Sequence, residues 1–245
     1  MRIEDQIVVI RFLMVFIVLL MVTMSFITLR KVLKYYKLLT TELQIKLLRK
    51  RIDPHFLGNL LQSLNVFFDR GQKDDIHKII NEYSNLVKTN FEYLDSDTVP
   101  LEQEIRMLMQ FLHTHNLMSE GKIHYELRAS IHSTNTNLMV PAMLLQPLLE
   151  NALEHGIKHN PNPQIILEFH VADTLRIRII DNGVGMDHQV TIKHNGSLNV
   201  TLKRIRLLNE LSKEHYTMRW LNDLSEYHIE RGCGIEITLP VTPSK

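Results

Sequence analysis

The sequence has 245 residues, of which 44% are apolar and 22% are charged, and this globular composition excludes wholesale disorder and collagen-like repeats. Its 28 basic and 27 acidic residues leave a net charge of +1, so no bulk positive charge favours nucleic acid as a partner. The single cysteine, Cys233, excludes an internal disulfide and a zinc cluster, which is typical of a reducing compartment.

Residues 12–29 (FLMVFIVLLMVTMSFITL) carry no charge. At about 1.5 Å per residue, and with residues 7–10 added, this stretch is long enough to cross a hydrocarbon core of about 30 Å. Four basic residues follow immediately: Arg30, Lys31, Lys34 and Lys37. By the positive-inside rule we predict a single-pass anchor at residues 1–30 in the plasma (inner) membrane, in contact with membrane lipid, with the C-terminal domains in the cytoplasm. A cleaved signal peptide and a buried core helix are the alternatives.

Residues 31–97 have the pattern of helices. Residues 31–52 lack glycine and proline and predict a helix that continues from the membrane. After Asp53-Pro54, apolar residues recur every three or four positions: Phe56, Leu57, Leu60, Leu61, Leu64, Phe67 and Phe68. A turn at Gly71 leads to a second helix from about residue 74 to residue 93. The wide apolar stripe of this hairpin predicts a homodimer, in which four helices bury it.

Residues 98–245 alternate between helical and strand patterns. We expect helices at 101–118, 141–155 and 198–212, and strands at 122–129, 164–171, 174–181, 216–221, 227–231 and 234–240. This order predicts a two-layer α/β sandwich.

The segment IDPHFLGN (52–59) places a histidine beside a proline at the start of a predicted helix. With Asp53 as the cap, the imidazole of His55 lies near unpaired amides, and the helix dipole favours its neutral, nucleophilic form. Alternatively, Asp53 holds the proton of the other ring nitrogen. Asn59 lies one turn further along the same face. A structural or surface histidine is the competing interpretation.

Polar residues interrupt the otherwise apolar helix at 141–155 and continue just past it: Glu150, Asn151, Glu154, His155 and Lys158. Their spacing of about four residues borders one helix face and suggests a ligand site. The amide oxygen of Asn151 suits Mg²⁺, while His155 and Lys158 can meet phosphate oxygens. A partly exposed helix face is one alternative, and a metal pair of His155 and His159 is another, which the intervening Gly156 disfavours.

The segment IIDNGVGM (179–186) ends a predicted strand in the carboxylate of Asp181. Gly183 and Gly185 then allow the main chain to approach a ligand closely or to adopt positive φ. An ordinary loop turn is the alternative.

In this order, the three blocks resemble the cytoplasmic half of a bacterial sensor histidine kinase of the LytS-like class. IDPHFLGNLLQSL resembles the phosphoacceptor box, PAMLLQPLLENALEHGIKH the N-box, DNGVGM the first glycine box, and GCGIEITLP the closing strand. The resemblance covers about residues 45–240. It implies an α+β multidomain protein with a helical dimerisation and phosphoacceptor region at 31–97 and an ATP-binding domain of the gyrase/Hsp90/histidine-kinase/MutL (GHKL, or Bergerat) type at 98–245.

The resemblance also implies a reaction. His55 would accept the γ-phosphoryl group of ATP and pass it to an aspartate in the receiver domain of a response regulator, with Asp53, Asn59 and Glu150 as further catalytic residues. Glu150 would polarise the histidine or a water molecule. The residues implied to bind ATP are Asn151, His155, Lys158, Asp181, Gly183, Gly185, Gly196 and Leu198, and Asn151 would also hold Mg²⁺.

Some positions depart from the family pattern. Gly58 stands where the family has phenylalanine, and Glu154 stands where a basic residue is usual. The second glycine box reads NGSLNV, in which Gly196, Leu198 and Arg204 fall near register. These departures leave open a catalytically impaired pseudokinase that acts as a dimerisation scaffold. A chaperone or topoisomerase fragment shares the implied fold but leaves the membrane segment and the histidine box unexplained.

Overall fold

The structure is a computed structural model that describes residues 13–14, 16–17, 19–34, 36–37, 40, 54–93, 96–131, 138–185, 196–212 and 215–241. The side chains of residues 54–56, 131 and 196–197 lie outside this description. The chain divides into two compact units, Met1–Gln44 and Ile45–Lys245, and each is described by itself.

The first unit is helical wherever it is described, with residues 19–34 as its longest continuous stretch. The described apolar side chains of this stretch are exposed. Among the described residues, no helix reaches the length and apolarity that crossing a membrane requires. The anchor expected at residues 12–29 is therefore not confirmed and stays a prediction.

The second unit begins with a helical hairpin. Helix α2 (Pro54–Asp69) and helix α3 (Lys73–Tyr93) are joined at Gly71, where the sequence indicated a turn. Gly71 adopts a φ of 72°, and its N–H donates to the carbonyl of Phe68 at 3.0 Å. A left-handed glycine just past the end of a helix satisfies carbonyls that the last turn leaves unpaired.

The hairpin packs against helix α4 (Leu101–Met118). Leu60, Phe67 and Ile79 form a small buried cluster, and Leu117 and Met118 of α4 pack against it. One face of α2 is thus buried within the chain.

A five-stranded mixed sheet forms the centre of the rest of this unit, in the order β2-β4-β5-β7-β6. Its strands are β2 (His124–Ile131), β4 (Gln164–Val171), β5 (Thr174–Asp181), β6 (Thr217–Trp220) and β7 (Cys233–Pro240). Strand β2 is parallel to β4, and the other neighbouring pairs are antiparallel. A separate antiparallel pair joins β1 (Thr98–Pro100) to β3 (Met139–Pro141).

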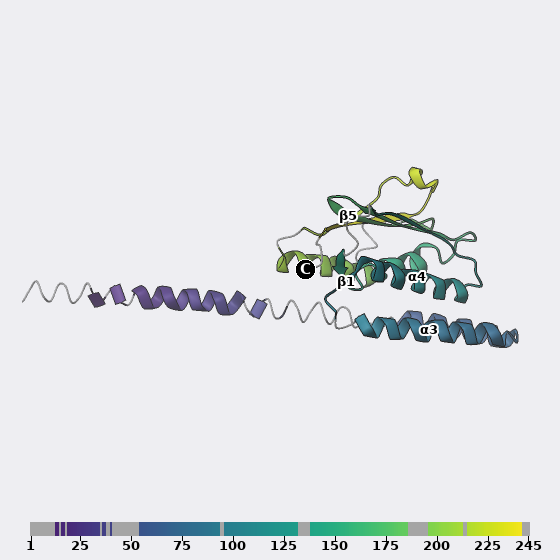
Figure 1. The fold of residues 1–245 in the computed structure, drawn as a ribbon, viewed down its shortest axis with the longest axis horizontal. Coiled ribbons are helices and arrows are strands. Elements are labelled where there is room, and N and C mark those ends of the chain that lie inside the picture. The colour runs from purple at the N-terminus through teal and green to yellow at the C-terminus, as the bar shows by residue number, and fades with distance from the viewer. Residues whose placement is uncertain are drawn as a thin grey trace, which may run out of the picture. The chain divides into compact units, whose positions relative to one another are not determined.

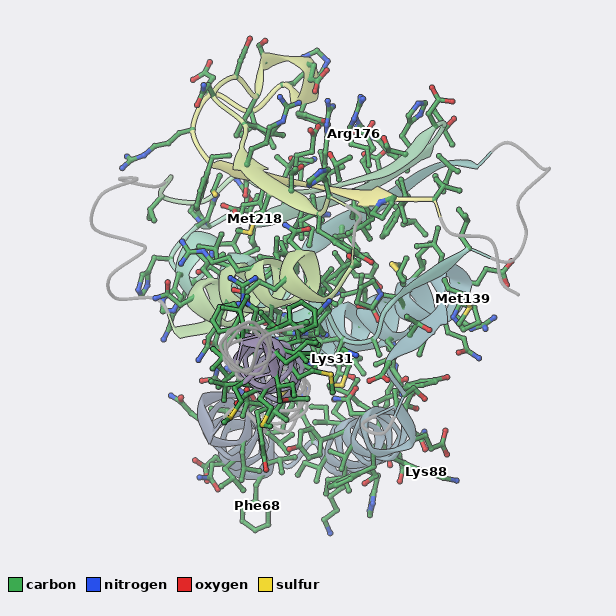
Figure 2. All side chains as sticks on the ribbon, turned by 90° about the vertical axis from the view of Figure 1, so that its left-hand side faces the viewer. Lys31, Phe68, Lys88, Met139, Arg176 and Met218 are labelled. Atoms are coloured by element: carbon green, nitrogen blue, oxygen red, sulfur yellow. The ribbon has the colours of Figure 1, made fainter. Side chains whose placement is uncertain are left out.

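Helices cover one face of this sheet. They are α4, α5 (Gln146–Asn151), the π-helical turn η1 (Ala152–Gly156) and α7 (Gly196–Leu211). Because side chains alternate along a strand, Leu175, Ile177 and Ile179 of β5 enter the main core with these helices. Figure 1 shows α4 along one face of the sheet, and Figure 2 shows Arg176 and Met218 on opposite faces. The predicted α+β fold is confirmed for this part of the chain.

The other face of the sheet carries a row of alternating charges, one from each strand. Arg128, Glu168, Arg178, Glu236 and Arg219 are neighbours in the strand registers. Arg178 Nε donates to Glu236 Oε2 at 2.8 Å, and Arg219 Nε donates to Glu236 Oε1 at 2.7 Å. Glu236 is only 2% exposed, and hydrogen bonds from these arginines lower its pKa against the opposing effect of burial. Opposite charges at cross-strand positions stabilise the pairing of the strands.

The strand expected at 227–231 is wrong. The chain instead forms a short 3₁₀ helix, η2 (Ser225–Tyr227), and the N–H of Tyr227 donates to the carbonyl of Leu224 at 3.0 Å. The Tyr227 hydroxyl donates to Glu168 Oε2 at 2.7 Å and accepts from Arg178 Nη1 at 2.7 Å. This segment folds over the charged row because its aromatic side chain finds partners there, so it supplies no strand to the sheet.

The helix expected at 141–155 starts later than predicted and continues through η1 to Gly156. Pro141 ends β3, and α5 begins only at Gln146. The N–H groups of Met143 and Leu145 donate to a side chain of α4 rather than within a helical turn. Tertiary contacts thus delay the helix by one turn.

Candidate functional site

Asp181 is the last residue of β5, and its side chain faces the helical layer at 3% exposure. The carboxylate Oδ1 accepts the N–H of Gly183 at 2.9 Å, and the carboxylate also accepts the N–H of Cys233 on the neighbouring strand. Burial raises the pKa of Asp181 to about 6, although both N–H donors oppose this change. Asp181 is therefore a buried acceptor with fixed orientation.

Three glycines allow close packing at Asp181, of its side chain, its backbone carbonyl and the segments beside it. A Cβ added to Gly156 would lie 2.7 Å from Asp181 Oδ1. A Cβ on Gly183 would overlap the carbonyl of Gly156, and one on Gly232 would overlap the carbonyl of Asp181. The absence of side chains lets three segments, from η1, from the loop after β5 and from the start of β7, meet at Asp181.

The loop after β5 is held from two sides. The side chain of Asn182 accepts the N–H of Gln164 at 2.8 Å and donates to the carbonyl of Asn162 at 2.8 Å. On the other side, Arg231 Nε donates to the carbonyl of Val184 at 2.9 Å. Gly185 has a φ of 77°, a conformation that favours glycine. The turn that the sequence indicated is present, and side chains fix its path.

The polar residues expected on the helix at 141–155 lie on α5 and η1. Asn151 is 4% exposed at the end of α5, and Glu150 is half-buried with its Oε1 accepting from Gln146 Nε2 at 3.0 Å. His155 on η1 is exposed, as is Lys158 beyond it. The π-helical turn η1 directly follows Asn151, and such turns are frequent at functional sites.

A second meeting point involves the hairpin. Asn59 of α2 lines a cavity of about 520 Å³ together with Glu154 and Lys158. The backbone of His55 belongs to the first turn of α2, but its side chain and all of Asp53 lie outside the described residues. The structure therefore brings Asn59 near the end of the N-box segment and leaves the expected role of His55 untested.

The remaining expected residues lie at the start of α7. Gly196 is its first residue, and Leu198 is fully buried in the main core. The side chain of Leu198 is thus part of the core that the helices share with the sheet.

Sequence reasoning did not assign Gly156, Gly232 or Cys233 to the site. The pairing of β5 with β7 places Cys233 opposite Asp181, and no local sequence pattern indicates this pairing. Burial and the charge of Asp181 raise the pKa of the Cys233 thiol to about 12, so this thiol is an inert neighbour of the carboxylate. Within the described ranges, no group of three or more His, Cys, Asp or Glu side chains is arranged to hold a metal ion.

A larger cavity of about 810 Å³ lies beside Gly185 and is lined mostly by residues 220–225 and 229–234. Its lining includes Gly234, Leu221 and Leu224, and these two leucines pack with Ile180 against the opposite face of the sheet from Asp181. We therefore place the candidate site at Asp181 and not in this cavity.

The carboxylate of Asp181 suits a ligand with a hydrogen-bond donor, because it can accept from an exocyclic amine. The glycines let η1 and the neighbouring segments pack closely at Asp181. The buried amide of Asn151 on the neighbouring helix offers an oxygen of the kind that Mg²⁺ prefers. This donor set fits a magnesium–nucleotide complex.

Comparison with known proteins is consistent with that chemistry. Residues 43–123 match the model of the histidine kinase family. The chain is 27% identical over 207 residues to the sensor histidine kinase YesM of Bacillus subtilis, covering 83% of this chain and 34% of YesM. It is 26% identical over 198 residues to the sensor protein LytS of Oceanobacillus iheyensis, covering 73% of this chain and 33% of LytS. The chain thus spans about a third of the length of these two relatives.

Among solved structures, the histidine kinase domain of the blue-light activated histidine kinase of Erythrobacter litoralis is similar at a TM-score of 0.46 and 16% identity. The match covers 82% of this chain and 95% of that one.

Proposed function

Because this chain is homologous to the sensor histidine kinases LytS and YesM, we propose that it is an ATP-dependent histidine kinase of a two-component system. It transfers the γ-phosphoryl group of ATP to His55 and then to an aspartate in the receiver domain of a response regulator. Mg²⁺ is the accompanying cofactor.

The observation that carries this proposal is the buried carboxylate of Asp181, which packs against Gly156 and accepts the N–H of Gly183. A buried, fixed carboxylate selects a ring that carries an amine donor, because a ring with only acceptors would leave both groups unpaired. Adenine meets this requirement. Asn151 lies on the helix that runs into Gly156, so the same element supplies the metal-binding amide and a wall of the adenine site.

The proposed phosphoryl transfer requires few side chains of the protein. A nitrogen of the His55 imidazole attacks the γ-phosphorus, the bond from that phosphorus to the bridging oxygen of ADP breaks, and ADP leaves with the electron pair. Glu150 accepts the proton that the imidazole loses, and Gln146 orients its carboxylate through the 3.0 Å bond. His155 and Lys158 are exposed and available to phosphate oxygens. Asn151 would hold Mg²⁺, which would supply positive charge beside the phosphates, and positioning accounts for most of the catalysis in such a loose transition state.

The hairpin supports a homodimer. Although one face of α2 is buried against α3 and α4, Leu57, Leu61 and Phe68 are exposed, and Phe68 is 74% exposed. Figure 2 shows the side chain of Phe68 pointing outward from the helical hairpin. A second copy of the hairpin would cover these residues and form a four-helix bundle.

Attachment to the plasma membrane through residues 12–29, with lipid around that segment and the later domains in the cytoplasm, belongs to the same proposal. Its support is the uncharged stretch and the basic residues after it. Full-length protein that stays in the soluble fraction after cell lysis would contradict it.

The central experiment is phosphoryl labelling. The full chain in detergent is incubated with Mg²⁺ and ATP labelled at the γ-phosphate, and the label should be stable to alkali and lost in acid, as phosphohistidine is. We expect His55→Ala to abolish labelling. His77→Ala, at an exposed histidine of α3, is the matched control and should label normally.

Two results would contradict the proposal. Equal labelling of the wild type and His55→Ala would show that His55 is not the acceptor. A folded wild type that binds Mg²⁺–ATP but never becomes labelled would instead indicate a pseudokinase scaffold. Asn151→Asp should reduce labelling strongly, since the added charge opposes the phosphates, and it should also lower thermal stability, since the new carboxylate is buried.

A further inference from the structure

The loop at residues 142–145 between β3 and α5 is irregular and buried. Ala142, Leu144 and Leu145 are at most 1% exposed. Met143 has a φ of 55°, which is uncommon for a residue with a side chain. Buried backbone without regular structure needs hydrogen-bond partners from elsewhere, and a strained residue persists only when its surroundings hold it.

Two buried side chains supply these partners from opposite sides. The carboxylate of Glu104 accepts the N–H of Met143 at 3.0 Å and the N–H of Leu145 at 3.2 Å. The guanidinium of Arg204 donates to the carbonyl of Met143 and, at 2.6 Å, to the carbonyl of Ala142. Glu104 and Arg204 are each 1% exposed. We call these two residues and the loop between them the 104–204 clamp.

The charges of the clamp are matched. Burial raises the pKa of Glu104, while the backbone donors and the positive charge of Arg204 act to lower it. A single buried charge without an opposite partner would be strongly destabilising, so each residue requires the other.

The clamp joins three helices. Glu104 lies in the first turn of α4, Arg204 lies within α7, and the loop leads directly into α5 with Glu150 and Asn151. A shift of α7 relative to α4 would pull on the carbonyls of the loop while Glu104 holds its N–H groups. The start of α5 would then move, and Asn151 with it.

We propose that Glu104 and Arg204 are positioning residues of the nucleotide site, which couple the placement of α7 to that of the Asn151 helix. This rests on the proposed function, because the site they position is the Mg²⁺–ATP site. A buried ion pair that only stabilised the fold could be replaced by apolar side chains. Apolar side chains could not replace Glu104 and Arg204, because these two bind four backbone groups of one strained loop.

The test measures Mg²⁺–ATP affinity of the full chain by titration calorimetry, at a temperature where every variant is folded. We expect Glu104→Gln and Arg204→Lys each to weaken affinity about tenfold. The double variant should be weakened by clearly less than the product of the two effects, because both act through the same loop. Glu102→Gln and Arg206→Lys are matched controls at exposed positions of the same helices and should bind like the wild type.

Thermal unfolding measured in parallel separates positioning from stability. A purely structural pair would lower the melting temperature and leave the affinity of the folded protein unchanged, and that result would overturn the inference. Strictly multiplicative effects in the double variant would overturn it too. If Glu104→Gln fails to fold, Arg204→Lys carries the same test, because it keeps the charge and loses part of the donor set.

The two proposals fail in distinguishable ways. A folded wild type without measurable Mg²⁺–ATP binding overturns both the proposed function and this inference. A wild type that binds normally beside variants of equal affinity overturns only the inference.

Discussion

Replacement of Asp181 by asparagine should make the protein more stable at neutral pH while it weakens nucleotide binding. In the folded protein, burial raises the pKa of Asp181 from 3.8 to about 6. The unfolded chain therefore releases the proton at lower pH than the folded chain does. Stability from this residue is highest below about pH 4, falls as the pH rises towards 6, and is constant above that.

The size of the effect follows from this difference. A pKa of about 6 against 3.8 corresponds to roughly 3 kcal/mol of unfolding free energy at pH 7. Asparagine removes this penalty because it has no charge to bury. Its amide oxygen can still accept the N–H of Gly183, but its NH₂ group cannot accept the N–H of Cys233, which costs about 1 kcal/mol. We expect a net gain of about 2 kcal/mol at pH 7.

Urea unfolding of the wild type and of Asp181→Asn tests this prediction. The free energy of unfolding is measured between about pH 3.5 and pH 8, at steps of about half a pH unit. Because all other titrating groups are shared, the difference between the two proteins isolates Asp181. The advantage of the variant should grow between about pH 4 and pH 6 and then level off. A difference that does not change with pH, or a variant that is less stable at pH 7, would refute the argument. Mg²⁺–ATP affinity of the same variant should fall, because an amide donor would face the amine of adenine.

Four further variants test other parts of the chain, each by thermal or urea unfolding. Gly58→Ala should stabilise α2 by up to about 1 kcal/mol, since a Cβ there meets nothing within 4 Å. Gly71→Ala should instead destabilise the protein, because Gly71 has a φ of 72°. Equal effects of the two variants on stability would contradict this expectation. Gly183→Ala should abolish Mg²⁺–ATP binding and lower stability by several kcal/mol, because its Cβ would overlap the carbonyl of Gly156. A variant as stable as the wild type would be inconsistent with that contact. Glu236→Gln should cost about 1 kcal/mol, because Arg178 loses the charge of Glu236 but keeps Glu168 and Glu226 as partners. A variant as stable as the wild type would indicate that the charge of Glu236 contributes little.

The periodic parts of the sequence predicted the structure well. Leucine and phenylalanine at three- and four-residue steps indicated α2, and the β-branched runs at 164–171 and 174–181 match β4 and β5 to the residue. In these segments the local pattern and the buried face agree, so nearby residues carry the information.

The pattern failed where distant residues bind the backbone or the side chain. A strand was expected at 227–231, but the hydroxyl of Tyr227 bonds to Glu168 and Arg178 on other strands. Pro141 looked like a helix start, yet Glu104 and Arg204 hold the following loop in an irregular path. No window around either segment contains its partner, so local reasoning could not find it.

The residues of the candidate site also fall into two groups, those that the sequence indicated and those that only the fold brings together. Asp181, Gly183 and Asn151 were recognisable from motif and order, because their residue types and spacing are themselves the signal. The roles of Gly156, Gly232 and Cys233 depend on the pairing of β5 with β7 and on the π-helical turn η1, which bring separate segments within contact distance.

The order of chemical groups along this chain, with a histidine beside a proline, an amide-bearing helix and an aspartate before two glycines, is a property of the sequence by itself. Folding decided which of these groups touch: it buried Asp181 where glycines let three segments pack closely, and it tied the Asn151 helix to α4 and α7 through Glu104 and Arg204. Spacing along the chain is set by covalent bonds, whereas close approach depends on sheet register and on buried polar groups finding partners that lie far away in sequence.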